Sequence, residues 1–263
     1  MSPDAPAYRK IADALRTKIR TGELAPGALL PTQAELAERY AVARMTVRQA
    51  LTELSNEGLI FAQQGRGTIV RERRPVVYRP GAEYFPRITR RLDRFMAKLQ
   101  KEGRESAQSI DVAVEAADAF VAQRWQIEPG EPVAVRRRVR YVDGEPFNIN
   151  DTYYRYDLAR ATAIMNPADI PSGSNNVLDA KGYAEVRAID EIYVRMPLQE
   201  EIRRLHLQPG TPVAVHVVTG YTASEEPCRV DVFVLPGDRH VILSERIRPD
   251  TADDTSQIED DTK

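Results

Sequence analysis

The first forty residues carry apolar side chains at a helical spacing. A stripe at i, i+3, i+4, i+7 and i+11 predicts a first helix, which Gly22 ends. Its members are Tyr8, Ile11, Ala12, Leu15 and Ile19. The turn that follows contains two prolines and a glycine, so the helix cannot continue through it. Thr32 with Glu35 three residues later matches a capping box, which predicts that a second helix begins there.

Another apolar stripe predicts a third helix over residues 43–58, which ends at Gly58. Its members are Val47, Ala50, Leu51 and Leu54. Only residues 41–43 separate this helix from the preceding one, which predicts a helix-turn-helix whose second helix enters a DNA groove. Off the stripe, Arg44, Arg48 and Gln49 can bind base edges or phosphates. For this helix taken alone, a solvated charged face is the alternative interpretation.

After Gly58 the apolar spacing changes to that of strands. Residues 59–62 and 68–70 predict two strands, and the polar segment between them predicts a hairpin tip. Gly65 and Gly67 allow the backbone to approach a phosphate or a groove wall closely, and Arg66 can enter a minor groove. The hairpin is therefore predicted to be a wing beside the helix-turn-helix.

Residues 8–70 resemble, without a gap, the winged-helix DNA-binding domain of GntR-type bacterial transcription regulators. The resemblance rests on L-P-T-Q-A-E-L, A-R-M-T-V-R-Q-A-L and the wing G-R-G-T. It implies DNA contacts from the third helix and the wing. The predicted DNA-binding residues are Thr32, Arg44, Thr46, Arg48, Gln49, Gln64, Gly65, Arg66 and Gly67. Ala43 replaces a serine that is usual in the family, and alanine cannot cap the third helix.

The proline-rich residues 71–86 have no periodicity and predict a linker between two domains. Arg71, Arg73 and Arg74 form either a solvated charge run or a further contact to DNA. Beyond the linker, the pattern predicts an amphipathic helix over 88–99, a strand over 109–114 and a helix around 116–125. The acidic residues 250–263 have almost no apolar content and predict a disordered tail.

One segment of the second part occurs twice, at an offset of 80 residues. The copies I-E-P-G-E-P-V-A-V and L-Q-P-G-T-P-V-A-V each predict a strand, a turn and a return strand. The return strands are expected at 147–153 and 229–235, with the first turn at Asp143-Gly144. Two similar units predict a two-lobed α+β sheet domain, and a cleft between such halves is a common site for a small ligand.

Strand alternation places Arg136, Arg138 and Arg140 on one face of the predicted sheet. Three arginines on one face cannot form a core. We expect them to be solvated, paired with acids, or in contact with an anionic ligand.

Residues 87–248 resemble the UTRA effector-binding domain of the HutC subfamily of the same regulators. The resemblance rests on the P-G-x-P-V strand entries, R-V-R-Y-V-D-G-E-P-F and P-G-D-R-H. It implies a fold related to chorismate lyase, with a central antiparallel sheet, flanking helices and a ligand in a cleft. It also implies ligand contacts from Arg138 and Arg140. Members that bind sugar phosphates carry other residues where this chain has Arg94 and Asn150, so we predict a ligand site of altered chemistry at Arg94, Arg138, Arg140 and Asn150.

Composition and charge narrow the class of protein. Residues 1–74 hold twelve Lys and Arg against eight Asp and Glu, a charge of +4 that is compatible with nucleic acid. We expect no signal peptide, because residues 1–8 contain no apolar central region. The chain has no apolar run of membrane-spanning length, and its single cysteine, Cys228, favours the cytoplasm. Its three histidines lack metal-ligand spacing, so we expect neither a metal nor a cofactor.

These patterns predict an α+β protein with four segments: a winged helix-turn-helix domain over 1–71, a linker over 72–86, a UTRA-like effector-binding and dimerisation domain over 87–249, and a tail over 250–263. We expect a cytoplasmic homodimer, most readily a repressor, that binds a palindromic operator in double-stranded DNA and responds to a small-molecule effector. Membrane contact is not expected. The alternatives are a lyase-like small-molecule enzyme, for which no activated nucleophile is visible, and a DNA-binding protein without an effector.

Overall fold

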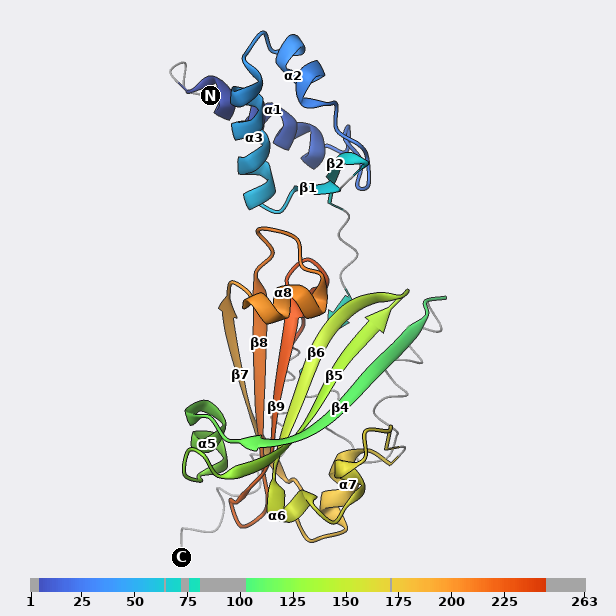
Figure 1. The fold of residues 1–263 in the computed structure, drawn as a ribbon, viewed down its shortest axis with the longest axis vertical. Helices are drawn as coiled ribbons and strands as arrows, with labels where there is room; N and C mark the ends of the chain where they lie inside the picture. Colours follow the sequence, from blue (N-terminus) through green and yellow to red (C-terminus); the bar gives the residue numbers. More distant parts are fainter. Residues whose placement is uncertain (1–4, 64, 72–75, 81–102, 171, 245–263) are drawn as a thin grey trace, which may run out of the picture.

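The computed structural model describes residues 5–63, 65–71, 76–80, 103–170 and 172–244. Figure 1 shows a helical N-terminal domain (residues 5–71) above a sheet-rich C-terminal domain (residues 103–244). The predicted helix over 88–99, with Arg94, lies outside the described residues, as do Gln64 and the tail over 250–263. Within the described ranges, no helix is long and apolar enough to cross a membrane.

Three helices and one hairpin form the N-terminal domain. They are α1 (Ala7–Arg20), α2 (Gln33–Arg39), α3 (Arg44–Asn56) and the antiparallel pair β1 (Ile60–Gln63) and β2 (Gly67–Val70). The predicted stripes of α1 and α3 face each other in one buried cluster, where Ala12, Val47, Ala50 and Leu54 are fully inaccessible. Removing these stripes from water is the main term that holds the three helices together. The predicted helix-turn-helix and wing are confirmed.

The N-termini of α2 and α3 are built differently. In α2 the backbone N–H of Thr32 donates to Glu35 Oε2 over 2.7 Å, and the Thr32 hydroxyl accepts from the Glu35 backbone N–H over 3.3 Å, as predicted. The Thr32 backbone N–H and the Thr32 hydroxyl both donate to the Glu35 carboxylate, and these two hydrogen bonds lower the pKa of Glu35. At the start of α3, Ala43 makes no side-chain capping bond, which confirms the predicted departure. The helix stops before Gly58, whose φ of 67° is left-handed.

A six-stranded antiparallel sheet forms the C-terminal domain, in the order β4-β5-β6-β9-β8-β7. The strands are β4 (Ser106–Ala116), β5 (Pro132–Val142), β6 (Glu145–Arg155), β7 (Arg187–Arg195), β8 (Val213–Tyr221) and β9 (Pro227–Pro236). The two predicted repeat units correspond to the hairpins β5-β6 and β8-β9, and edge strands β4 and β7 extend them on either side. The two hairpins join at the β6–β9 pair, so the two units share one continuous sheet.

Short helices cover both faces of this sheet. α5 (Ala119–Trp125) and α8 (Gln199–Leu205) pack on the face that carries Ile149 and Asp151, where Arg204 of α8 lies 3.6 Å from the Asp151 carboxylate. α6 (Tyr156–Ala159), the 3-10 helix η1 (Ala163–Met165) and α7 (Ser174–Asp179) follow β6. The loop that contains η1 lies on the opposite face, where Arg136 of β5 binds its carbonyl groups.

Part of the predicted linker is folded, which corrects the expectation of an irregular segment. Residues Val76–Tyr78 form β3, which pairs in parallel with β10 (His240–Ile242). The Tyr78 hydroxyl lies 2.8 Å from Nδ1 of the buried His216, and His216 Nε2 lies 2.6 Å from Asp190 Oδ1. Tyr78 also packs with Phe233 and Leu235 against β8 and β9. The chain between the two domains is therefore tied to the C-terminal sheet.

Candidate functional site

The first turns of α3 present a polar surface. Arg44, Arg48 and Gln49 are exposed and Thr46 is half-buried, while the apolar stripe of the same helix faces inward. Within the described part of the chain, neither Arg44 nor Arg48 forms an ion pair, so both guanidinium groups can bind phosphates or base edges. Thr32 is exposed, but its hydroxyl forms the hydrogen bonds of the α2 cap. The main role of Thr32 in this structure is therefore to stabilise the start of α2.

The wing brings glycine backbone to the surface beside this helix. Gly65 and Gly67 have φ angles of 77° and 102°, a region that residues with a side chain rarely adopt. A Cβ atom on Gly67 would also lie 3.1 Å from Leu29 Cδ1. Arg66 between them is exposed. The turn therefore presents one guanidinium group flanked by two glycines, an arrangement that lets a wing approach DNA closely.

A second polar surface lies on the C-terminal sheet. We call it the arginine face and define it as Arg136, Arg138 and Arg140 of β5 with Asn148, Asn150 and Thr152 of β6. The strand register places Arg138 opposite Asn150, and Arg140 opposite Asn148. The structure thus brings together three of the four predicted ligand residues, whereas Arg94 lies outside the described part.

Arg138 is a cation without an acidic partner among the described residues. Its Nη1 donates to Asn150 Oδ1 over 3.0 Å and to Thr152 Oγ1 over 3.1 Å, both of which are neutral groups. Burial, together with nearby Arg140, lowers the pKa of Arg138. Arginine stays protonated in proteins, so the lowered pKa marks an unfavourable charge that an anionic ligand would stabilise.

Arg136 corrects the prediction that the whole arginine row lies outside the core. Its side chain is 1% exposed, and it donates to the carbonyl oxygens of Ile164, Asn166 and Ala168 over 2.5–2.9 Å. These bonds hold the loop around η1 on the sheet. Arg136 is therefore a structural residue that borders the ligand-binding candidates.

The neighbouring asparagines retain hydrogen-bonding capacity. Asn150 Nδ2 and Asn148 Oδ1 are buried without a hydrogen-bond partner among the described residues. Buried polar groups are normally satisfied, so these atoms, beside Arg138, are suited to a polar ligand. Sequence reasoning missed Asn148 and Thr152. The alternation N-I-N-D-T after Phe147 was the available signal, because it places both residues on the same face as Asn150.

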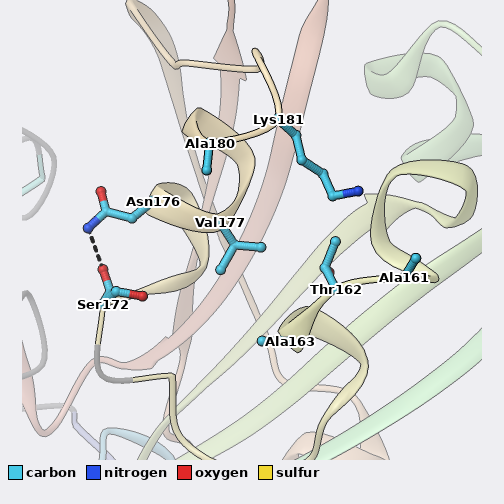
Figure 2. Close-up of a pocket in the computed structure, with 8 residues that line it drawn as sticks. All are labelled: Ala161, Thr162, Ala163, Ser172, Asn176, Val177, Ala180 and Lys181. Carbon is cyan, nitrogen blue, oxygen red and sulfur yellow. Dashed lines mark hydrogen bonds between the residues drawn. The ribbon is translucent and has the colours of Figure 1, made fainter.

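A separate hollow of about 470 Å³ lies at α7 (Figure 2). Its lining includes Thr162, Asn176, Val177 and Lys181, and Asn176 Nδ2 donates to the Ser172 carbonyl over 2.6 Å. Arg138, Arg140 and Asn150, the predicted ligand residues that the structure describes, do not line it. We favour the arginine face as the ligand site. Among the described residues, its Arg138 forms no ion pair, and it holds buried polar atoms that lack a hydrogen bond.

Comparisons with protein families agree with the two-part organisation. Residues 7–70 match the family model described as bacterial regulatory proteins, gntR family, and residues 101–241 match the UTRA domain. An uncharacterised HTH-type transcriptional regulator of Streptomyces coelicolor is 30% identical over 100% of both chains. The mannosyl-D-glycerate transport/metabolism system repressor MngR of Escherichia coli K12 is 33% identical over 82% of this chain and 85% of its own. The repressor NagR of Bacillus subtilis is 27% identical over 90% and 93%.

Solved structures share the fold. The crystal structure of a chain assigned to the GntR family of transcriptional regulators has a TM-score of 0.66 at 26% identity, and the match covers 94% of this chain and 99% of that one. PhnF from Mycobacterium smegmatis has a TM-score of 0.54 at 21% identity, over 91% of this chain and 100% of its own, which supports the fold alone.

Proposed function

Because the chain belongs to the gntR family of bacterial regulatory proteins and carries a UTRA domain, we propose that it is a cytoplasmic homodimeric repressor that responds to a small anionic effector. Its helix-turn-helix domain binds DNA, and its UTRA domain binds the effector. Two cationic surfaces carry the proposal: the start of α3, and Arg138 on the arginine face. Neither forms an ion pair with an acid in the part of the chain that the structure describes.

Effector chemistry follows from the arginine face. A guanidinium group beside amide and hydroxyl groups suits a ligand with a carboxylate or phosphate and neighbouring hydroxyl groups. The name of the relative MngR refers to mannosyl-D-glycerate, which combines a sugar with a carboxylate. We therefore propose a hydroxylated small acid, and a thermal-shift screen with sugar acids and sugar phosphates tests this class.

We propose that the chain acts without catalysis. Cys228 is buried, and burial raises the pKa of its thiol to about 12, so it is a poor nucleophile at neutral pH. Incubation with chorismate should leave that compound unchanged. Turnover would instead support the lyase-like alternative.

Edge strand β7 supports a two-fold dimer. It carries exposed Ile189, Ile192, Tyr193 and Val194, and the following loop adds Met196 and Leu198, each 43–74% exposed. An apolar sheet edge of this kind favours pairing with another chain. We propose that a second copy covers it, since a two-fold dimer presents its α3 helices to the two halves of a palindrome.

DNA binding is tested by replacing the α3 arginines. DNA selected from a random pool by the full chain provides the operator. Arg44→Ala and Arg48→Ala should each lower operator affinity by about 1–3 kcal/mol if these groups contact bases. Arg160→Ala, which removes an exposed arginine of the C-terminal domain, is the matched control. Unchanged gel-shift affinity in both α3 variants would refute the assignment.

A further inference from the structure

The turn at Gly210 of the C-terminal domain lies against the C-terminal end of α3. A Cβ atom on Gly210 would lie 2.6 Å from the carbonyl oxygen of Asn56 and 2.8 Å from that of Ser55. Cβ atoms do not approach backbone oxygens so closely, so only glycine permits this contact without a shift of the backbone. In Figure 1, the end of the sheet that carries α8 faces the end of α3 that leads into β1.

The internal repeat shows that turn geometry alone does not explain Gly210. Gly130 is its counterpart in the first copy, and the two glycines have φ angles of 94° and 73°. Both follow a left-handed helix end, at Gln126 and His206. A Cβ atom on Gly130 would meet nothing within 4 Å. Both turns therefore require a positive φ, but only the second copy also contacts the DNA-binding domain.

Arg71 forms the other half of this contact. Its backbone N–H donates to the Leu59 carbonyl over 2.9 Å, which anchors it to the N-terminal domain. Its side chain crosses to the C-terminal domain, where Nη1 lies 2.5 Å from Thr211 Oγ1 and 3.2 Å from Asp238 Oδ2. Nη2 donates to the Pro209 carbonyl over 3.2 Å. The Arg71 and Asp238 side chains are 5% and 13% exposed, so salt screens this pair less than a surface pair. The predicted solvation of Arg71 is wrong, because the residue is buried, while the alternative of a DNA contact stays a prediction.

The turn that holds Asp238 rests on the arginine face. Arg239 donates to the carbonyl of Pro146 at the start of β6. His240 lies 3.4 Å from Asn148 through Nε2 and Nδ2, and its ring centroid lies 4.2 Å from that of Phe147. Asn148 in turn faces Arg140 in the strand register. A continuous set of contacts thus runs from the proposed ligand site to Arg71.

We propose that Arg71, Gly210, Thr211 and Asp238 form an interdomain latch that fixes the direction of α3 relative to the C-terminal sheet. An effector on the arginine face shifts the His240 turn and thereby changes the population of the latched state. This coupling requires the effector to bind one latch state more tightly than the other. The coupling step rests on the proposed function, whereas the latch itself does not.

The latch can be tested without DNA or effector. Spin labels at Thr21→Cys and Asp111→Cys, both exposed sites, report the distance between the domains, while the buried Cys228 stays unlabelled. Labelled full-length chain diluted with unlabelled chain should give one narrow distance. The Gly210→Ala and Arg71→Ala variants should instead give a broad distribution of distances. Gly130→Ala carries the same backbone strain without the contact and should retain the narrow distance.

Further variants separate misfolding from loss of the latch. Asp238→Asn keeps the size of the side chain and should broaden the distance distribution with an unchanged circular dichroism spectrum. Wild-type distributions in Gly210→Ala, Arg71→Ala and Asp238→Asn would overturn the latch.

The coupling route is tested on DNA selected by the wild-type chain. His240→Ala and Arg71→Ala should change affinity for this DNA by the same factor, and the double variant should show no additional change. If the two single-variant changes in DNA affinity multiply in the double variant, the proposed coupling route is wrong. If no variant and no wild-type chain selects DNA, the proposed function fails, while the distance measurement still decides whether the latch exists.

Discussion

At the scale of single residues, two arginines of one strand have opposite surroundings. Arg136 donates three hydrogen bonds to loop carbonyls, whereas Arg138, two residues later on the same face, donates to an amide and a hydroxyl. The first supports the fold. The second keeps a charge in a half-buried place at a cost in stability, which is typical of a binding site.

This difference predicts opposite effects of substitution. Arg136→Ala should lower the free energy of unfolding by about 2 kcal/mol, because three loop carbonyls, of which that of Ile164 is buried, lose their donor. Arg138→Ala should change stability little but abolish the thermal shift produced by an anionic ligand. Urea unfolding followed by Trp125, the single tryptophan, measures stability in the C-terminal domain. A stable Arg136→Ala variant would show that other groups hold the loop.

The start of α3 offers a second prediction at this scale. Ala43 has an extended backbone and no side-chain bond to the first turn, so Ala43→Ser can supply the missing acceptor. We expect a gain of about 0.5–1 kcal/mol in the stability of the N-terminal domain. Calorimetry of the full chain would detect the higher midpoint, with exposed Ala41→Ser before the helix as a control. An equal shift in both variants would contradict the capping explanation.

At the scale of elements, the two edges of the sheet differ. Edge strand β7 carries a row of exposed apolar side chains, whereas Val114 is the one large apolar side chain that is exposed on edge strand β4. Val194→Glu on β7 should therefore give a monomer, because it places a charge in the proposed dimer contact. Val114→Glu on β4 should leave the mass unchanged. Light scattering after gel filtration measures both, and a Val194→Glu dimer would exclude β7 as the interface.

The local patterns and motifs of the sequence predicted most of the helices and strands. They did not predict contacts between residues that lie far apart in the sequence. The helical stripes through Val47 and Leu54, the Thr32 cap and the repeat at Gly130 and Gly210 each have a short-range signature. β3 has only three residues, and its partner begins at His240, so no periodicity reveals it. The burial of Arg136 likewise depends on carbonyls 28–32 residues away, which strand alternation cannot show.

At the scale of the whole molecule, stability should depend on pH through His240. Burial, with Arg239 and Arg140 nearby, lowers the pKa of His240 to about 3. The unfolded chain binds a proton near pH 6.5 that the folded chain excludes, so stability is full above pH 6.5 and falls as the pH decreases toward 3. Between pH 7 and 5.5 this one group predicts a loss of about 1.3 kcal/mol.

Trp125 fluorescence in urea series at these pH values measures the loss. His240→Tyr, which keeps an aromatic ring without a group that titrates there, should remove most of the dependence. If the stability of the variant depends on pH as steeply as that of the wild-type chain, another residue binds the proton.

The parallel pairing of β3 with β10 has a mechanical consequence. Tension from the DNA-bound domain enters β3 at Val76, and β10 is attached to the sheet at the same end, through Arg239. Parallel strands loaded at one common end peel apart one hydrogen bond at a time, and the first bond in line joins Val76 N–H to the Arg239 carbonyl. Arg71 precedes β3 in the chain, so its contacts with the C-terminal domain bear the tension before the β3–β10 pair does. A pull strong enough to release Arg71 would therefore lengthen the tether in small steps, and each step would let α3 move further from the C-terminal sheet.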